Sequence, residues 1–310
     1  MSSARATAPL IPPALRPGAT IGVAALSGPP DLSRLDAGIA RLRRRGYAVV
    51  EAANVRRREG LFAGNDAERA QGYVALLKDP RVAAIFFARG GYGAGRILDR
   101  IDAGDLAANR KPHLGGSDVT ALFALCARIP LVAFYGPMVA VELATEEGLD
   151  WEDVLSGAPP AEHLFAPEDV LAPGRGEGLV SGGCLSLLAA LCGTPEALSP
   201  AGRLLFWEDV GEEIYRLDRM LTQLERSGTF DRIQGMIIGS VVSRHRAETP
   251  EKVREYLRHR FQGAPFPVAA GLPAGHLDRP RTLPLHVPAR LELASGAPRL
   301  TFLAPAVALP

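Results

Sequence analysis

Apolar residues in the first half of the chain follow two alternating patterns, which predict two kinds of element. Residues 20–26 (TIGVAAL) and 82–88 (VAAIFFA) are short continuous apolar runs, as expected of strands buried on both faces of a sheet. In residues 32–45, by contrast, apolar positions recur every three or four residues, as on one face of a helix. The same reasoning predicts strands at 47–51 and 131–135 and helices at 66–77 and from about residue 119 onward.

Strands that alternate with helices of this length indicate right-handed βαβ units, in which helices cover both faces of a parallel sheet. The alternation stops at residues 143–177, where four prolines and several glycines indicate a linker. It resumes with strands predicted at 203–207 and 235–242 and helices at 185–191 and 214–226. We expect an α/β protein in four parts: a disordered leader at 1–17, an N-terminal α/β domain at 18–142, the linker or crossover at 143–177 and a C-terminal domain at 178–310.

Composition narrows the class of protein. The 310 residues are 47% hydrophobic and 22% charged with a formal net charge of +1, which gives no electrostatic reason to expect a nucleic-acid or membrane partner. No stretch reaches the roughly 18 consecutive apolar residues of a membrane span, and the N-terminus lacks the apolar run of a signal peptide. The three cysteines have no Cys-x-x-Cys spacing, so neither a disulfide framework nor a zinc site is indicated. We expect a cytoplasmic protein.

Residues 111–125 (KPHLGGSDVTALFAL) carry the first candidate for catalysis, Ser117. A strand-like approach, two glycines, the serine and an apolar helix predict a tight turn that exposes the hydroxyl and directs the first N–H groups of the helix toward it. The nucleophile elbow of hydrolases is Gly-x-Ser-x-Gly, and here Val119 replaces the last glycine. Taken alone, the stretch favours the other interpretation, in which Ser117 or Asp118 only caps the helix, because that is the commoner role of such residues.

A glycine-rich turn at 89–96 (RGGYGAGR) follows the predicted strand 82–88. Its glycines do not have the spacing of a dinucleotide-binding turn, because Arg96 stands where the third glycine or alanine is needed. Four glycines in six positions still indicate a close approach of the backbone to another group, or a positive φ. The turn is therefore either a second part of an anion or oxyanion site beside Ser117 or simply a tight loop.

Two further candidates follow predicted strands in the second half. Glu208 comes directly after the apolar strand 203–207 (RLLFW), where the sheet is still buried, so its carboxylate needs a partner. His276 lies on a Gly/Pro-rich loop at 267–284, whereas the other histidines have ordinary contexts. A single histidine on a loop is usually a solvated residue. The spacing of these acidic residues and histidines matches no metal-ligand pattern, so we expect no metal.

Ser117, Glu208 and His276 share one setting, because each lies at or after the end of a predicted strand and beside a glycine-rich turn. In open α/β sheets, sites form at such strand ends. A nucleophilic serine needs a base to accept its Oγ proton and an acid to orient that base, and these residues supply the set in the order serine, acid, histidine. A binding module without catalysis has no need of all three.

Six segments together resemble the L,D-carboxypeptidase family of serine peptidases, which includes the muramoyl-tetrapeptide carboxypeptidases and the microcin C self-immunity hydrolases. The segments are RGGYG (89–93), GGSDVTAL (115–122), YGPM (135–138), SGGCLSLL (181–188), FWEDVGEEIYRLDRML (206–221) and AGLPAGH (270–276). The resemblance covers nearly the whole chain, from Gly18 to about Leu285, and its motifs stand in the family's order.

The resemblance implies a catalytic triad of Ser117, Glu208 and His276. It also implies an oxyanion hole formed by the backbone N–H groups of Gly91 and Asp118. The implied fold is an N-terminal parallel-sheet α/β domain of the flavodoxin or Rossmann kind, joined to a smaller C-terminal α/β domain, with the triad at the domain junction. Homodimers are common in the family, and no cofactor is implied.

We expect substrate contacts from the glycine-rich turn, through Arg89, Gly90 and Tyr92, and from Cys184. The Arg89 guanidinium is the natural partner for a terminal carboxylate, since a net charge of +1 provides no global field. Cys184 stands where the family usually has asparagine, and Gly116 stands where it usually has an aromatic residue. A thiol lacks the donors and the acceptor of an amide, so substrate choice is less determined than reaction class.

Three hypotheses for function follow. The leading one is a cytoplasmic serine carboxypeptidase that removes a C-terminal D-amino acid from murein tetrapeptide during cell-wall recycling. The second is a hydrolase of the amide or phosphoramidate bond in an aminoacyl-nucleotide antibiotic, as in the self-immunity members. The third is a non-catalytic ligand-binding module in which Ser117 only caps a helix. The expected partner is accordingly a small peptide or an aminoacyl-nucleotide, and neither nucleic acid nor a membrane.

Overall fold

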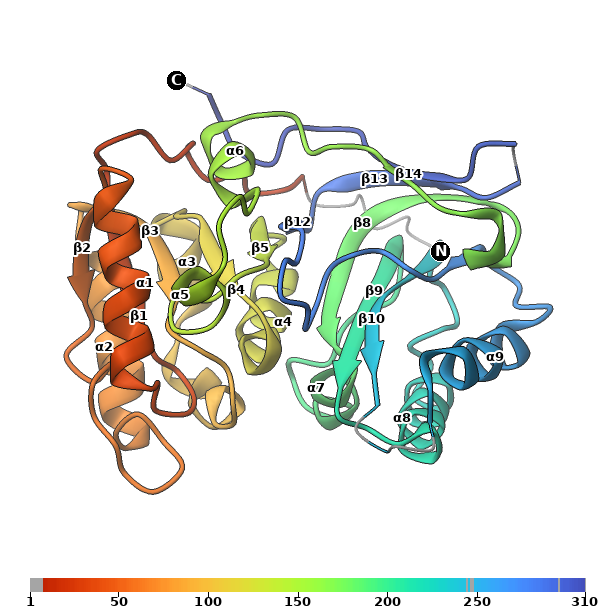
Figure 1. The fold of residues 1–310 in the computed structure, drawn as a ribbon, viewed down its shortest axis with the longest axis horizontal. Helices are drawn as coiled ribbons and strands as arrows, with labels where there is room; N and C mark the ends of the chain where they lie inside the picture. Colours follow the sequence, from red (N-terminus) through yellow and green to blue (C-terminus); the bar gives the residue numbers. More distant parts are fainter. Residues whose placement is uncertain (1–7, 244, 246–247, 295, 310) are drawn as a thin grey trace.

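The structure is a computed structural model and describes residues 8–243, 245, 248–294 and 296–309. Two lobes lie side by side, each built around its own sheet (Figure 1). The N-terminal half of the chain forms most of one lobe, and the segment from β8 (Arg175–Cys184) onward forms most of the other. The expected two-lobed α/β architecture is confirmed. No helix of the described part is both long and apolar enough to cross a membrane.

The first lobe contains a six-stranded sheet with the strand order β12-β5-β4-β3-β1-β2. Its strands are β1 (Thr20–Ala24), β2 (Ala48–Glu51), β3 (Val82–Phe87), β4 (His113–Gly115), β5 (Ala133–Tyr135) and β12 (Leu283–Leu285). The pairs among β1 to β5 are parallel, as predicted, whereas β12 is antiparallel to β5. The helices of this lobe are α1 (Leu32–Arg44), α2 (Asp66–Lys78), the 3-10 helix η1 (Ala94–Arg100), α3 (Ala103–Ala108) and α4 (Thr120–Arg128).

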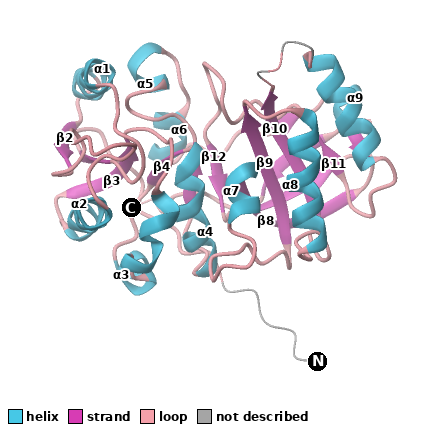
Figure 2. Ribbon diagram, turned by 90° about the horizontal axis from the view of Figure 1, so that it is seen from below, coloured by secondary structure: helices cyan, strands magenta, loops and turns pink. Residues whose placement is uncertain are grey.

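The second lobe contains an eight-stranded mixed sheet with the order β6-β14-β13-β8-β9-β10-β11-β7. Its strands are β6 (His163–Leu164), β7 (Val170–Ala172), β8 (Arg175–Cys184), β9 (Arg203–Val210), β10 (Gly235–Val242), β11 (Val268–Ala269), β13 (Pro288–Glu292) and β14 (Arg299–Phe302). The neighbours β8 to β11 run parallel. Helices α7 (Leu185–Ala190) and α8 (Ile214–Arg226) lie side by side over one face, and α9 (Pro250–Phe261) lies beside α8 (Figure 2).

Residues 143–177, expected to be a linker or crossover, contain short elements that are part of the fold. Helix α5 (Glu142–Thr145) begins just before them, and they contain α6 (Trp151–Ser156), the 3-10 turn η3 (Pro167–Asp169) and the edge strands β6 and β7. These elements have two to six residues each. Hydrophobic periodicity needs a longer window, so the sequence pattern could not reveal them.

The part of the expected disordered leader that the structure describes, residues 8–17, is ordered. Residues 1–7 lie outside the described part of the chain, but residues 8–17 pack against the protein. Leu10 forms a parallel bridge with Leu131, and the N–H of Leu15 donates to the Leu155 carbonyl at 2.7 Å. The side chain of Leu15 is buried. Burial of single apolar side chains fixes this segment although it has no periodic pattern.

A continuous apolar core joins the two lobes. Tyr135, the last residue of β5, packs its ring against Phe123 of α4 and Phe206 of β9, with ring centroids 6.2 and 5.4 Å apart. Leu283 and Leu285 of β12 belong to the same buried cluster. Because β12 belongs to the late part of the chain but completes the first sheet, the expected division at residues 143–177 does not separate the sheets. The strand ends of both lobes therefore meet over one core.

Candidate active site

Ser117 lies on a strained turn between a strand and a helix. It follows β4 and begins the 3-10 turn η2 (Ser117–Val119), which leads into α4. Its φ is 58°, in the left-handed region that few residues other than glycine adopt. In the described part of the chain, no side chain makes a cap hydrogen bond at the N-terminus of α4. The cap interpretation of Ser117 is therefore not supported, and the strained turn corresponds to a nucleophile elbow without its last glycine.

The glycine-rich turn lies directly against this serine. A Cβ atom on Gly90 would stand 2.6 Å from Cβ of Ser117 and 2.7 Å from its Oγ. The next residue, Gly91, has a φ of 108°. Gly93, the third glycine of the turn, has a φ of 132°. The glycines therefore allow both positive φ values and a close approach of the backbone to Ser117, the candidate nucleophile.

Two buried charged side chains hold the turn in place. The Oδ2 atom of Asp118 accepts hydrogen bonds from the Ser27 hydroxyl at 2.5 Å and the Ala94 N–H at 2.7 Å. Burial raises the pKa of Asp118, and these two hydrogen bonds act in the opposite direction. On the other side, the fully buried Arg69 donates from Nη1 to the Gly93 carbonyl at 2.8 Å. Sequence reasoning missed Arg69 and Ser27, because a single arginine on a helix usually faces solvent.

Glu208 and His276 form a hydrogen-bonded pair. Glu208, at 0% exposure near the end of β9, accepts two hydrogen bonds at Oε2, from Nδ1 of His276 at 2.8 Å and from its backbone N–H at 3.0 Å. Burial alone would lower the pKa of His276, but the hydrogen bond and charge of Glu208 raise it overall, helped by the charges of Asp209 and Glu142. Gly275 is required here, since its Cβ would stand 2.4 Å from Oε2 of Glu208.

Tyr135 connects this pair to the serine, and sequence reasoning assigned it no role. Its hydroxyl donates to Oε1 of Glu208 at 2.6 Å and accepts the N–H of Ser117 at 2.8 Å. Burial raises the pKa of Tyr135 well above its usual range, so the hydroxyl remains a donor. An aromatic residue at the end of a buried strand ordinarily belongs to the core, and the YGPM segment contains no further signal.

The remaining link of a triad, from serine to histidine, is not formed in this structure. Among the described residues, the Oγ atom of Ser117 makes no hydrogen bond. Catalytic hydrogen bonds are often long without substrate, so this does not remove His276 as the base. The Nδ1 atom of His276 bonds to Glu208, which leaves Nε2 as the atom that can accept a proton.

The candidate substrate contacts lie in different environments. Arg89 is exposed and donates from Nη1 to the Pro29 carbonyl at 3.3 Å, so it fastens the glycine-rich turn to the loop after β1. Tyr92 is 56% exposed, and its ring packs against Phe62 with centroids 5.8 Å apart. Both side chains are therefore accessible to a ligand at the mouth of the turn.

Cys184 does not have the position expected of a substrate contact. Its side chain is buried, with Sγ 3.2 Å from the Ser186 hydroxyl and 3.6 Å from Oδ2 of Asp209. Its N–H donates to Oγ1 of Thr120. Cys184 ends β8 at the start of α7 and packs between the lobes, so its geometry indicates a structural role. Among the described residues, no three histidine, cysteine or acidic side chains are grouped so that they could hold a metal ion.

Two family models match the chain. Residues 21–136 match the N-terminal domain of LD-carboxypeptidase, and residues 177–291 match the C-terminal domain of LD-carboxypeptidase. Together they cover more than half of the chain.

Named relatives agree with these models. A Streptomyces coelicolor protein, whose name gives carboxypeptidase as an unproven activity, is 42% identical over 96% of this chain and 98% of its own length. The murein tetrapeptide carboxypeptidase of Pseudomonas aeruginosa is 30% identical over 83% of this chain and 88% of its own.

Solved structures have the same fold. The muramoyltetrapeptide carboxypeptidase of Oxalobacter formigenes superposes with a TM-score of 0.82 at 29% identity, over 94% of this chain and 99% of its own. The microcin C7 self-immunity protein MccF, in complex with aspartyl sulfamoyl adenosine, superposes with a TM-score of 0.86 over 97% of this chain and 100% of its own. Its identity is 24%, so this second likeness shows the fold alone.

Proposed function

The chain belongs to the LD-carboxypeptidase family, as its motifs predict, and from this premise we propose that it is a serine carboxypeptidase acting on murein tetrapeptide. It hydrolyses an L,D peptide bond and releases the C-terminal D-amino acid, in the cytoplasm and as a homodimer. The observation that carries the proposal is the network in which Tyr135 joins the strained Ser117 to the Glu208–His276 pair.

In the first half of the reaction, Nε2 of His276 accepts the Oγ proton of Ser117 while Oγ attacks the scissile carbonyl carbon. The negative charge on the carbonyl oxygen is stabilised by the N–H groups of Gly91 and Asp118, which lie on the two segments that meet at the serine. Glu208 keeps the proton on Nδ1 and stabilises the imidazolium. The C–N bond then breaks, and the leaving amine takes the proton from Nε2.

In the second half, water hydrolyses the acyl ester. His276 accepts a proton from the water, the oxygen attacks the ester carbon, and Oγ of Ser117 takes the proton back as it leaves. The products are the free D-amino acid and the shortened peptide. The raised pKa of His276 makes it a stronger base, at the cost of a larger protonated fraction near neutral pH.

A carboxypeptidase must also hold the terminal carboxylate of its substrate. Arg89 is the exposed cation at the entrance of the glycine-rich turn, so it either reaches that carboxylate or fixes the turn through its bond to Pro29. Gly90 leaves room for the substrate beside Oγ, and Tyr92 offers an exposed ring to the peptide. Cys184 is omitted from this set because its thiol is buried.

The murein substrate is favoured over the aminoacyl-nucleotide by the relatives. The Pseudomonas aeruginosa enzyme named for murein tetrapeptide is 30% identical to this chain, and MccF of Escherichia coli is 27% identical. The difference is small, so the substrate must be decided by assay. The purified protein is incubated with murein tetrapeptide, with its C-terminal amide and with an aminoacyl-nucleotide, and the products are weighed by mass spectrometry.

Loss of the terminal D-amino acid from the free acid alone supports the proposal. Turnover of the nucleotide in place of the peptide overturns it, and so does turnover of neither. The variant Arg89→Ala then separates two roles of the guanidinium. If Arg89 binds the carboxylate, the free acid loses its advantage over the amide; if it only anchors the turn, both substrates slow together.

A further inference from the structure

The helix that follows Ser117 packs against the second lobe. Helix α4 belongs to the first lobe, but it lies beside β8 and α7 of the second (Figure 2). Its residues from Thr120 to Ala127 are all buried, and most of them are apolar. Apolar contacts stabilise this packing without fixing its register, because the hydrophobic effect has no preferred direction. The position of α4 along the second lobe must therefore depend on polar contacts.

The first polar contact lies three residues after Ser117. The N–H of Cys184, at the end of β8, donates to Oγ1 of Thr120 at 2.9 Å. Gly183 brings the backbone of β8 so close to α4 that a Cβ atom there would stand 2.4 Å from the same Oγ1 atom. Because Thr120 is fully buried, solvent does not compete for this hydrogen bond.

Two side chains donate to backbone carbonyl groups farther along α4. Nε2 of His286 donates to the Phe123 carbonyl at 3.2 Å, and Nη2 of Arg203 donates to the Ala127 carbonyl at 2.9 Å. Positions 120, 123 and 127 have the spacing i, i+3, i+7, so the three contacts follow one side of the helix. We call these three contacts the interlobe seam.

Ser181 of β8 joins the two side-chain donors of the seam. Its Oγ atom accepts a hydrogen bond from Nη1 of Arg203 at 2.7 Å and lies 3.1 Å from Nδ1 of His286. Since a carbonyl can only accept, Nε2 of His286 carries the proton, and the hydroxyl donates to Nδ1. Burial and the charge of Arg203 lower the pKa of His286 to about 3, so the ring is neutral. The hydroxyl and both ring nitrogens thereby have partners, and satisfied buried networks of this kind are rigid.

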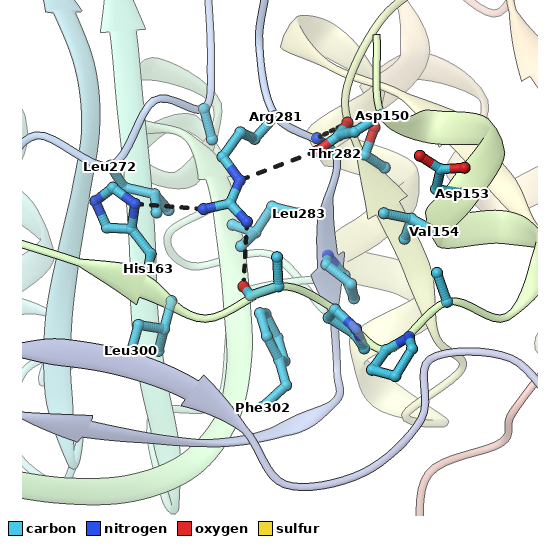
Figure 3. Close-up of a pocket in the computed structure, with 16 residues that line it drawn as sticks. Asp150, Asp153, Val154, His163, Leu272, Arg281, Thr282, Leu283, Leu300 and Phe302 are labelled. Carbon is cyan, nitrogen blue, oxygen red and sulfur yellow. Dashed lines mark hydrogen bonds and ion pairs between the residues drawn. The ribbon is translucent and has the colours of Figure 1, made fainter.

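His286 also marks the point where the chain passes from one sheet to the other. After the loop that carries His276, the chain enters the first sheet at β12, where the N–H of Thr282 donates to Oδ1 of Asp150 at 2.8 Å (Figure 3). Strand β12 ends just before His286, and β13 of the second sheet begins two residues after it. The φ of His286 is 65°, and its N–H donates to the Val180 carbonyl of β8 at 2.5 Å. A residue other than glycine keeps this conformation only where its surroundings hold it, so the crossing is closely fixed.

The reacting groups of the mechanism above lie on different lobes. Ser117 leads into α4, whereas His276 is held by Glu208 near the end of β9. Proton transfer from Oγ to Nε2 must therefore cross the boundary between the lobes. The glycine-rich turn at 89–96 follows β3, so the expected substrate contacts lie on the same lobe as Ser117. A shift of α4 along β8 changes the distance for proton transfer more than it changes those contacts.

We propose that the interlobe seam positions the nucleophile, and that Thr120 and Arg203 are positioning residues of the reaction. The inference rests on the function proposed above. Without the seam, α4 keeps its apolar contacts but loses the bonds that fix its register on β8. The Oγ atom of Ser117 and the ring of His276 then adopt a wider range of distances. Misplacement of reacting groups by about 1 Å lowers a rate by about 100-fold, so the seam acts on kcat.

The kinetic test compares two variants of the seam with a matched control. Arg203→Met removes both guanidinium bonds, and Thr120→Val removes one acceptor with little change in volume. Arg290→Met is the control, since Arg290 pairs with Glu177 within the second lobe. We expect kcat to fall about 10- to 100-fold in each seam variant while KM stays within about twofold, and neither to change in the control. If Arg203→Met does not fold, as judged by circular dichroism, Thr120→Val decides the test.

A distance measurement tests the seam without a substrate. Spin labels are attached to cysteines introduced at Arg44 and Arg226, the exposed last residues of α1 and α8, which lie on different lobes. Cys192, the one cysteine that is not buried, is replaced by serine to prevent its labelling. We expect pulsed electron spin resonance to give a broader or shifted distribution of distances in the two seam variants and the wild-type distribution in Arg290→Met.

The proposal is overturned if the seam variants have the wild-type distances, or if the distances change while kcat does not. A rise in KM with kcat unchanged also overturns it, because the seam would then serve binding. If the wild type does not hydrolyse murein tetrapeptide, the proposed function fails, and the rate at which a fluorophosphonate labels Ser117 replaces kcat. That rate needs an activated serine but no peptide. A wild type labelled no faster than Ser117→Ala overturns both proposals.

Discussion

Two contacts hold Ser117 in its unusual backbone conformation. Its N–H donates to the Tyr135 hydroxyl, and Gly90 packs against its side chain. A φ of 58° costs a non-glycine residue roughly 1–2 kcal/mol, which the surrounding contacts must offset. The same conformation projects Oγ toward the glycine-rich turn. The strained conformation therefore falls on the residue that we propose as the nucleophile.

We expect Ser117→Ala to abolish turnover and leave the free energy of unfolding nearly unchanged, because the Oγ atom makes no hydrogen bond in the described structure. Ser117→Gly should abolish turnover as well but raise the free energy of unfolding by about 1 kcal/mol, since glycine adopts this φ without strain. Steady-state kinetics and urea denaturation measure the two quantities. Residual activity above about a thousandth of the wild type contradicts a covalent mechanism, given triad contributions on the order of 10⁴ or more.

Tyr135→Phe removes the bridge between the serine and the acid without changing the shape of the ring. Because a hydrogen bond to a charged group contributes about 1.5–3 kcal/mol, we expect kcat to fall about 10- to 100-fold with little change in KM. The pH profile provides the specific measurement. Activity falls when His276 is protonated, and loss of the donor on Glu208 must move the midpoint of that acidic limb. A fall in kcat with an unmoved midpoint would assign Tyr135 a purely structural role.

At the scale of elements, the end of β9 places two successive carboxylates on opposite faces of the sheet. Glu208 reaches His276, whereas Asp209 accepts the N–H of Ser186 at 2.7 Å at the start of α7. Glu208→Gln should therefore reduce kcat/KM heavily, while Asp209→Asn should affect stability more than rate. Kinetics together with thermal melting compare the two variants. Equal losses of rate would show that the two carboxylates share the role of orienting the histidine.

The glycine-rich turn provides a second test at this scale. Gly90→Ala would bring a methyl group within 2.7 Å of Oγ of Ser117, so we expect activity to fall at least 100-fold while the protein remains folded. Gly95→Ala is the matched control, since a Cβ there meets no atom within 4 Å. Activity and circular dichroism are measured for both. Normal activity in the Gly90→Ala variant would show that the turn does not lie against the reacting atoms.

At the scale of the whole molecule, the buried side chain of His286 ties the lobes together. The ring of His286 lies 3.1 Å from the Ser181 hydroxyl of β8 and 3.2 Å from the Phe123 carbonyl of α4. Burial lowers the pKa of His286 to about 3, and burial likewise lowers the pKa of His113 to about 4. Both are neutral in the folded protein at pH 7. His276 behaves in the opposite way, since its pKa is raised.

The signs of these shifts predict sensitivity to acid. For His286 the stabilisation is fully present above the unfolded pKa of about 6.5 and is lost as the pH falls toward 3, because the unfolded chain binds the proton first. The contribution of His276 is instead present below about 6.5 and lost as the pH rises through its raised pKa. The free energy of unfolding, measured by urea denaturation, should therefore decrease as the pH is lowered from 7 to 5. In the His286→Asn variant, whose asparagine tolerates the φ of 65°, this decrease should be smaller by about 2 kcal/mol. A decrease identical to that of the wild type would exclude His286 as its source.

Many of the longer strands of both sheets, and the helices packed on them, could be predicted from the local sequence pattern. The predicted helix 214–226 and strand 235–242 agree with α8 and β10 residue for residue, because long amphipathic or buried segments have a clear period. The edge strands β6 and β7 and the short helix α6 could not be predicted, since elements of so few residues carry no period. The packing of residues 8–17 was missed for the same reason: isolated apolar side chains, such as Leu15, fix it.

The sequence by itself determined the residue types of the candidate site and their order, because serine, acid and histidine each lie near or after the end of a strand. Only the tertiary structure decided which groups meet. It brought Tyr135 between Ser117 and Glu208, turned Asp209 away from His276 and buried Cys184 between the lobes. Such contacts join residues far apart in the chain, and no local pattern records which distant side chain a hydrogen bond will find.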